Sequence, residues 1–249
     1  GVYVIPDTVT MIGESAFAGD ETLKEVVIGP HVKAIGSGAF RGCTSLKKVT
    51  IAEGVESVGS YAFYGCSALE DIAFPSTVER LESYTFYGCE NLEALSLEHI
   101  KYIEDYAMWY CVSLEKVILS AELSAIDSWA FAQCQKLEEI NIGDCTHLTA
   151  IGDYAFADCA MLTDFVIPNG TQAIGKLVFY GCSRLTDITI PDSLSVVDFG
   201  AFTYTPWYQE REDDYLIVGN GVLIKCTVHP MYLDLADKGI RYIGGAAFR

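Results

Sequence analysis

The amino-acid sequence predicts a solenoid of mainly β or α/β class, a right-handed superhelix of about eleven coils of about 23 residues, with a parallel β-sheet along one face. Three observations lead to this prediction. An Ala-Phe pair recurs at nearly constant spacing, an alternating apolar segment precedes each recurrence, and prolines and glycines occupy fixed points of the period. A single coil of this kind cannot bury its apolar side alone, so its neighbours must stack on it.

The Ala-Phe pair, or a close variant, sets the period. Its second residue lies at Phe17, Phe40, Phe63, Phe86, Met108, Phe131, Phe156, Phe179, Phe202 and Phe248. Successive spacings are 23, 23, 23, 22, 23, 25, 23, 23 and 46 residues. The last gap equals two periods, which indicates that one coil has lost the pair but kept its length. We expect each pair to fill the interior from a short helical turn on the convex side of the coil.

The segment before each pair has the pattern of a short strand. In one repeat, Leu46, Val49 and Ile51 point to the same side of an extended chain, because side chains alternate between the two faces of a strand. Stacking would place successive strands about 4.8 Å apart in a parallel sheet. Prolines such as Pro75 follow the strands, where the missing N–H ends the ladder, and glycines such as Gly59 permit a tight corner.

These marks resemble the BspA-like leucine-rich repeats of bacterial cell-surface proteins. The dipeptides that carry the resemblance are Ile5-Pro6, Ile167-Pro168, Ile190-Pro191, Gly42-Cys43, Gly65-Cys66, Gly88-Cys89 and Gly181-Cys182. The resemblance implies a secreted or surface-displayed bacterial protein, in a family linked with adhesion to host matrix proteins or to other cells. It implies no catalytic residue and no cofactor, because the family motif has none to transfer.

The whole chain, residues 1–249, is predicted to be a single leucine-rich repeat domain, cut within a repeat at both ends. Residues 203–239 form a degenerate repeat. Within it, two apolar runs flank Gly219-Asn220-Gly221, which predicts a β-hairpin over 215–226 because glycine and asparagine accept the positive φ of the turn. We expect the hairpin to protrude from the coil or to widen it, either as a structural variant or as a functional element.

Charge and composition exclude several classes of function. The net charge of −18 would repel a phosphate backbone, so nucleic acid is not an expected partner. No apolar run approaches the roughly 18 residues of a membrane-spanning helix, so no membrane insertion is expected from this segment. The histidines fall at different phases of the repeat, and no nucleophile elbow, phosphate loop or zinc-protease motif is present. We therefore expect a monomer without enzymatic activity, cofactor or metal.

Seven cysteines share one position of the repeat and are expected to form a buried column of reduced thiols: Cys43, Cys66, Cys89, Cys111, Cys134, Cys159 and Cys182. Disulfides between adjacent coils are the alternative.

Cys145 and His147 lie in the one 25-residue unit, where two additional residues would bulge. A transition-metal site there lacks a second pair of ligands, so an ordinary loop is the simpler interpretation.

Two surfaces are candidates for contact with a partner. The outward strand positions carry Glu70, Asp71, Glu93, Glu115 and Glu138, which would face a basic protein surface or weakly held calcium, or would only confer solubility. Tyr84, Tyr106 and Trp129 belong to a column of aromatic residues before the Ala-Phe pair. This column either packs as part of the solenoid or, where exposed, contacts a protein or a glycan.

The first functional hypothesis is an extracellular adhesion or protein-interaction module that binds a protein or glycan of the host or of other microbes. The alternative is a structural spacer that displays other domains of a larger surface protein. Whether the isolated chain binds anything distinguishes the two.

Overall fold

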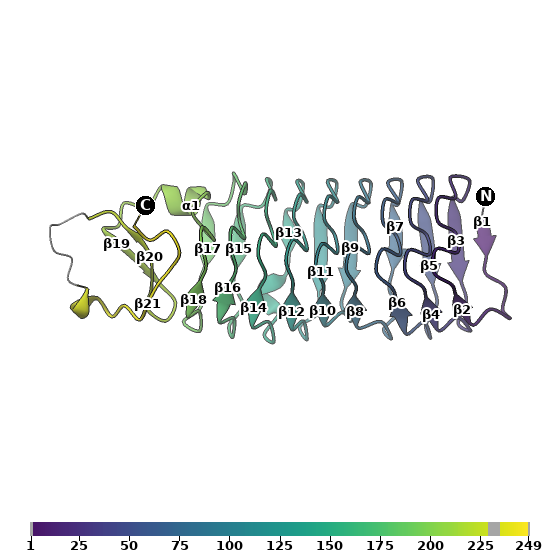
Figure 1. Cartoon of the computed structure of the whole chain (residues 1–249), viewed down its shortest axis with the longest axis horizontal. Helices are drawn as coiled ribbons and strands as arrows, with labels where there is room; N and C mark the ends of the chain where they lie inside the picture. The colour runs from purple at the N-terminus through teal and green to yellow at the C-terminus, as the bar shows by residue number, and fades with distance from the viewer. Residues whose placement is uncertain (1, 229–234, 249) are drawn as a thin grey trace.

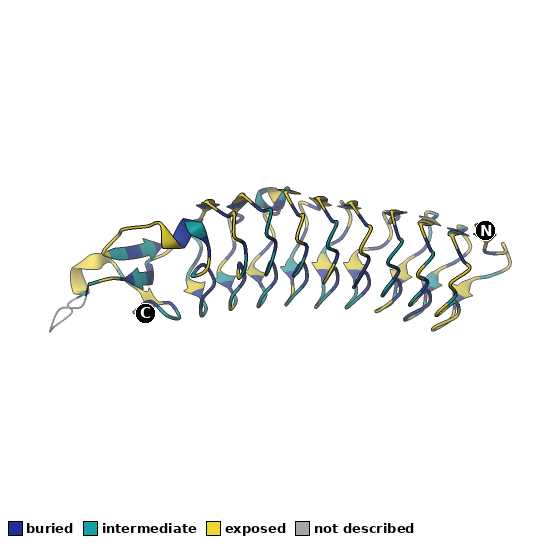
Figure 2. Cartoon of the chain, turned by 90° about the horizontal axis from the view of Figure 1, so that it is seen from above, coloured by how far each residue is buried: buried dark blue, intermediate teal, exposed yellow. Residues whose placement is uncertain are grey.

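The computed structural model describes residues 2–228 and 235–248. The described chain is an elongated stack of coils with the two termini at opposite ends (Figure 1). Seen from above, the stack follows a shallow arc (Figure 2). It contains about ten turns, one fewer than the spacing suggested. The predicted solenoid is therefore confirmed, with a small correction to the number of coils.

The expected strands form a first row along the stack, and the chain contributes one of them per coil. Neighbouring strands pair in parallel with a register of one repeat, as in Val26 opposite Val49. The strands are β1 (Val2–Val4), β3 (Glu25–Ile28), β5 (Lys48–Ile51), β7 (Asp71–Ala73), β9 (Ala94–Leu97), β11 (Lys116–Leu119), β13 (Glu139–Ile140), β15 (Asp164–Val166) and β17 (Asp187–Thr189).

A second row of two-residue strands, which the sequence did not predict, runs parallel to the first. Each begins one residue before the apolar residue of the Ile-Gly corner, and all but the last pair with a strand of the same row in an adjacent coil, as in Ile35 opposite Val58. The strands are β2 (Met11–Ile12), β4 (Ala34–Ile35), β6 (Ser57–Val58), β8 (Arg80–Leu81), β10 (Tyr102–Ile103), β12 (Ala125–Ile126), β14 (Ala150–Ile151), β16 (Ala173–Ile174), β18 (Val196–Val197) and β21 (Tyr242–Ile243).

Both rows are interrupted. The second row has no pairing between β6 and β8, and the first row has none between β7 and β9 or between β13 and β15. The last break coincides with the 25-residue unit, whose additional residues lie next to a 3-10 helix, η1 (Ile142–Asp144). The Asn141 side chain bonds to Leu119 of the preceding coil. Its Oδ1 accepts a hydrogen bond from the Leu119 N–H at 2.7 Å, and its Nδ2 donates to the Leu119 carbonyl at 3.1 Å. A side-chain amide thus takes the place of a peptide group in the ladder.

The Ala-Phe segment is a pair of tight turns and not the short helical turn that we predicted. The residue before the Ala-Phe pair or its variant has a left-handed backbone, with φ of 61° at Tyr61, 58° at Tyr84 and 59° at Tyr106. A right-handed helical turn cannot contain such a residue. Backbone groups bond instead to the next coil, as in Phe40 N–H to the Ala62 carbonyl at 2.8 Å.

The core is a set of stacked columns that continues through nearly the whole molecule (Figure 2). Phe40 and Phe63 are fully buried, and their rings stack 5.5 Å apart and nearly parallel, at 3°. Between Phe17 and Phe202 the column holds a phenylalanine in every coil except one, where the fully buried Met108 takes its place. Nearly every coil therefore contributes one large side chain from this position to a shared core, as the repeat predicted.

The expected hairpin is present near the C-terminus as β19 (Tyr215–Val218) and β20 (Val222–Cys226), which pair antiparallel. It does not simply protrude, because β20 pairs in parallel with β21 and the Asn220 N–H donates to the Leu194 carbonyl at 2.7 Å. Before it, Thr205 caps the short helix α1 (Pro206–Gln209). A second 3-10 helix, η2 (Ala236–Lys238), precedes β21. The hairpin thus occupies the place of the coil that has lost its Ala-Phe pair.

Candidate interaction surfaces

No group of three or more histidine, cysteine, aspartate or glutamate side chains in 2–228 and 235–248 is placed to hold a metal ion. Cys145 is buried, and its neighbour His147 contacts the Ala121 carbonyl at 3.3 Å. Within the same residues, no helix has both the length and the apolar character needed to cross a membrane. The candidate sites of contact with a partner are therefore surfaces of the stack.

The five acidic candidates lie on the exposed side of the first strand row or directly before it. Glu70, Asp71, Glu93, Glu115 and Glu138 are all exposed. Lysines from the adjacent coil neutralise three of them, because Lys47 lies 2.8 Å from Glu70, Lys48 2.7 Å from Asp71 and Lys136 3.5 Å from Glu115. The face is thus less acidic than its carboxylates alone indicate, and exposed pairs of this kind stabilise the fold by at most about 1 kcal/mol each.

The three aromatic candidates form part of an aromatic ladder, defined by Tyr61, Tyr84, Tyr106, Trp129 and Tyr154. Neighbouring rings stack within 10° of parallel, with centroids 4.8, 4.7, 6.0 and 4.1 Å apart in that order. Tyr84, Tyr106 and Trp129 are only partly exposed. Because each ring covers the face of the next, the ladder offers ring edges and hydroxyls to solvent. A sugar ring stacks on an aromatic face, so this geometry favours packing over glycan binding.

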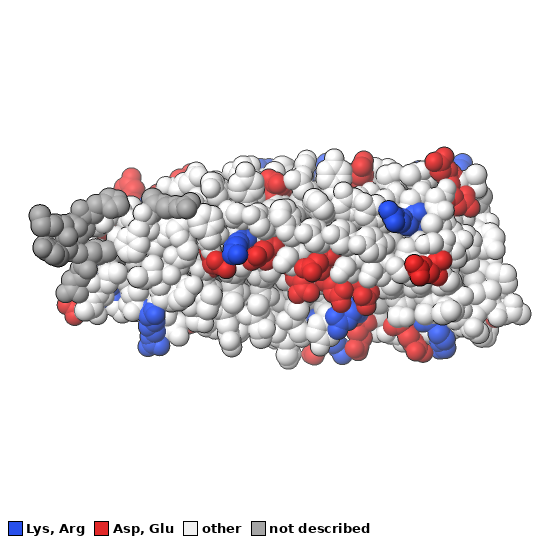
Figure 3. Space-filling view, viewed as in Figure 1, with Lys and Arg blue, Asp and Glu red and all other residues white. Residues whose placement is uncertain are grey.

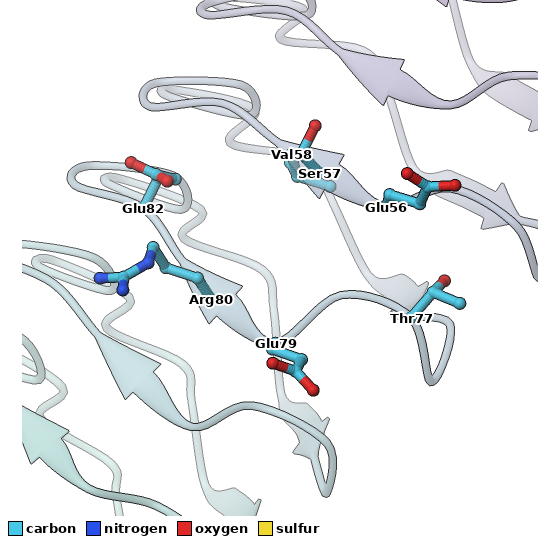
Figure 4. A pocket seen from close by; sticks show the side chains of 7 residues that line it. All are labelled: Glu56, Ser57, Val58, Thr77, Glu79, Arg80 and Glu82. Atoms are coloured by element: carbon cyan, nitrogen blue, oxygen red, sulfur yellow. The ribbon is translucent and has the colours of Figure 1, made fainter.

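The break between β6 and β8 opens a polar hollow of about 290 Å³, shown in Figure 4. It is lined by Glu56, Ser57, Val58, Thr77, Glu79, Arg80 and Glu82. Its arginine, Arg80, points away from Glu56 and Thr77 (Figure 4). It pairs with Glu104 of the next coil at 2.9 Å. Glu56 pairs with Lys33, and Glu79 with Lys101. The charges of the hollow are therefore largely satisfied within the chain.

A row of carboxyl groups that the sequence did not predict lies beside this hollow. At the position where most other coils carry glycine, three successive coils carry Glu82, Glu104 and Asp127. Acidic side chains gather near the middle of the face shown in Figure 3. Burial, followed by the charge of Glu104, raises the pKa of Glu82. Burial, followed by Asp105 and Glu104, raises the pKa of Asp127. The replacement of glycine by acidic residues in consecutive coils is the sequence pattern that indicates this row.

Glu82→Gln is expected to stabilise the protein at neutral pH. A carboxyl whose pKa is raised on folding costs stability once it ionises, so this cost is full above the raised pKa and disappears as the pH falls toward the ordinary glutamate range. Because the group is only partly buried, we expect a gain below about 1 kcal/mol, or about 1–2 °C in Tm. Thermal unfolding from neutral to acidic pH measures it. Glu14→Gln, which removes an exposed charge, is the matched control, and an equal shift in both variants would refute the explanation.

The cysteine column lies entirely inside the stack. All nine cysteines are buried and unpaired. Each of the seven column thiols donates to the carbonyl of the phenylalanine or methionine in the preceding coil, as in Cys66 Sγ to the Phe40 carbonyl at 3.1 Å. Burial raises the pKa of Cys43 to about 11 and that of Cys111 to about 12. The thiols are therefore donors in the protonated form, and the column is structural.

We expect none of the nine cysteines to react with a thiol reagent at about pH 8 in the native protein, because only an accessible thiolate is nucleophilic. All nine should react in concentrated guanidinium without reductant. Counting the thiols in both conditions tests this. A deficit of two or more after unfolding would show that members of the column are oxidised.

Comparison with known proteins agrees with this geometry. The model of a family described as "BspA type Leucine rich repeat region" matches the chain in six copies, over residues 3–115 and 81–209. A comparison with curated proteins found no match.

The solved structures that are similar to the chain include two bacterial leucine-rich repeat proteins. A leucine-rich repeat protein of T. pallidum is 25% identical, with a TM-score of 0.59 over 74% of this chain and 77% of that one. A leucine-rich repeat protein of Bacteroides ovatus ATCC 8483 is 22% identical, with a TM-score of 0.60 over 100% of this chain and 72% of that one. The second likeness concerns the fold alone.

Proposed function

This chain belongs to the BspA-type leucine-rich repeat family, and we propose that it serves as a non-enzymatic interaction module that is displayed on a bacterial cell surface and binds macromolecules of the host or of other microbes. The observation that carries the proposal is the uninterrupted core beneath an exposed strand row. A core shared by the coils beneath that row holds it in a fixed shape, and a rigid, extended surface suits the recognition of a large partner.

The exposed acidic residues of the strand face are the proposed contacts within this surface. They are exposed side chains on or directly before the strands of the first row: Glu70, Asp71, Glu93, Glu115 and Glu138. Tyr84, Tyr106 and Trp129 would contribute ring edges at most, since their faces are covered by neighbouring rings.

The experiment is capture of partners by the isolated chain. The purified protein is immobilised, exposed to extracts of host matrix and of microbial cell surfaces, and the captured macromolecules are titrated by surface plasmon resonance. We expect at least one saturable partner that soluble chain displaces. Resin without protein is the control, and failure of every captured macromolecule to saturate would contradict the proposal.

A structural spacer is the second candidate, and the same continuous core supports it. A stack of this kind, with each coil bonded to the next, is stiff enough to hold another domain at a distance. The capture experiment separates the two, because a spacer needs no partner of its own.

A further inference from the structure

The exposed strand row has two halves that differ in charge balance. In the N-terminal half, Lys47 and Lys48 pair with Glu70 and Asp71. In the C-terminal half, Lys116 pairs with Glu139 and Lys136 pairs with Glu115. These two lysines therefore do not neutralise the other carboxylates of this half. The C-terminal half therefore carries the excess of negative charge.

Three carboxylates of this half, those of Glu138, Asp164 and Asp187, have no cation within ion-pair distance among the described residues. Asp164 and Asp187 lie directly opposite each other on the paired strands β15 and β17. Like charges in that position destabilise a sheet. The same register position holds a lysine in other coils, at Lys48 and Lys116, so the fold itself does not require an acid there.

Apolar side chains are exposed between these acids. Ile118 is 36% exposed and Val166 is 44% exposed, on the same side of the row as the aspartates. The surface beside them is hollowed in two places, over β11 and β13 and over the broken ladder between β13 and β15. A hollow of about 330 Å³ borders Ile118 and Asn141, and another of about 220 Å³ borders Asn141 and Val166. An apolar side chain of a partner would fit against this part of the sheet.

We propose that this patch, defined by Ile118, Glu138, Asp164, Val166 and Asp187, is the docking surface for a basic polypeptide segment whose apolar side chains alternate with lysine or arginine. The apolar side chains lie against Ile118 and Val166 over the hollowed surface, and the cations pair with the three carboxylates. Phosphate-bearing partners are disfavoured by the same carboxylates. The inference rests on the proposed function and assigns it a location and a class of partner.

The test uses a fluorescent twelve-residue peptide of alternating lysine and valine, with binding measured by anisotropy at physiological salt. The variant is Glu138→Lys/Asp164→Lys/Asp187→Lys, which should fold because lysine already occupies these columns. The matched control, Glu14→Lys/Glu90→Lys/Glu212→Lys, changes the net charge equally at exposed positions outside the patch. We expect binding to weaken by at least about tenfold in the patch variant and by less than about threefold in the control.

The apolar part is tested by Ile118→Thr/Val166→Thr, which preserves the β-branched shape and every charge. We expect binding of the peptide to weaken about fivefold or more, and a peptide with serine in place of valine to bind the unchanged protein comparably weakly. Circular dichroism confirms that each variant is folded.

Three results would overturn the inference: equal weakening in the patch variant and its control, no effect of the threonine changes, or no saturable binding of the lysine-valine peptide. If macromolecules are nevertheless captured from extracts, the proposed interaction function is supported and only the assignment of the binding site to this patch is refuted. If nothing is captured either, the proposed function fails as well.

Discussion

Phe63→Ala is expected to lower the free energy of unfolding by about 3–5 kcal/mol, the range for removing a fully buried phenylalanine from a packed core. The ring is fully buried and stacks between Phe40 at 5.5 Å and Phe86 at 5.6 Å. The stacked rings cannot close the gap by a small shift, because backbone hydrogen bonds to both adjacent coils fix the spacing of the turns. Urea unfolding followed by far-UV circular dichroism measures the loss.

The chain supplies its own control at the same point of the repeat. Phe248 closes the last Ala-Phe pair but is 43% exposed. Phe248→Ala should therefore change the free energy of unfolding by less than about 0.5 kcal/mol. Similar losses in both variants would show that the phenylalanine position acts through the local turn and not through the stacked column.

The columns were predictable because they depend only on spacing. A residue that returns every 23 positions lies above its predecessor whatever the local conformation, and Phe40 and Phe63 stack as that rule requires. The same reasoning placed the thiols inside, where each donates to the coil before it, as Cys66 does to Phe40. Periodicity therefore determined which residues share an environment.

Local backbone conformation was predicted less well, because it does not follow from spacing. The Ala-Phe turn was expected to be helical, although Gly38 and Gly200 occupy the position that Tyr61 holds in another coil. Glycine at two of these points indicated a left-handed residue, which the aromatic residues at the other points concealed. The two-residue strands of the second row were too short to produce an alternating pattern.

The charge of the candidate surface could be predicted only in part. The carboxylates of Glu70 and Asp71 were recognised, but the pairing of Lys47 and Lys48 with them across coils depends on side-chain geometry. That Glu138, Asp164 and Asp187 have no cation partner is known only once the ion pairs of the other carboxylates are known. The candidate patch is therefore a result of the structure, whereas the face that carries it followed from the sequence.

Asn141→Ala is expected to lower the free energy of unfolding by about 2–4 kcal/mol, because it leaves two backbone groups of a buried residue without partners. Those groups are the N–H and the carbonyl of Leu119, which is 3% exposed. Asn91→Ala, at an exposed asparagine, is the control and should cost less than about 0.5 kcal/mol.

Asn141→Asp separates the two hydrogen bonds. A carboxylate can still accept from the Leu119 N–H, but it cannot donate to the Leu119 carbonyl and places negative charge against it. We expect this variant to be destabilised at neutral pH and to recover as the pH falls and the carboxyl regains a proton to donate, since its pKa must be raised by that carbonyl. Unfolding at several pH values measures the recovery. If the aspartate variant were as stable as the native protein at neutral pH, the donated bond would contribute nothing. The asparagine would then only fill space beside the broken ladder, and the hollowed surface next to Ile118 and Val166 would owe its shape to the inserted residues alone.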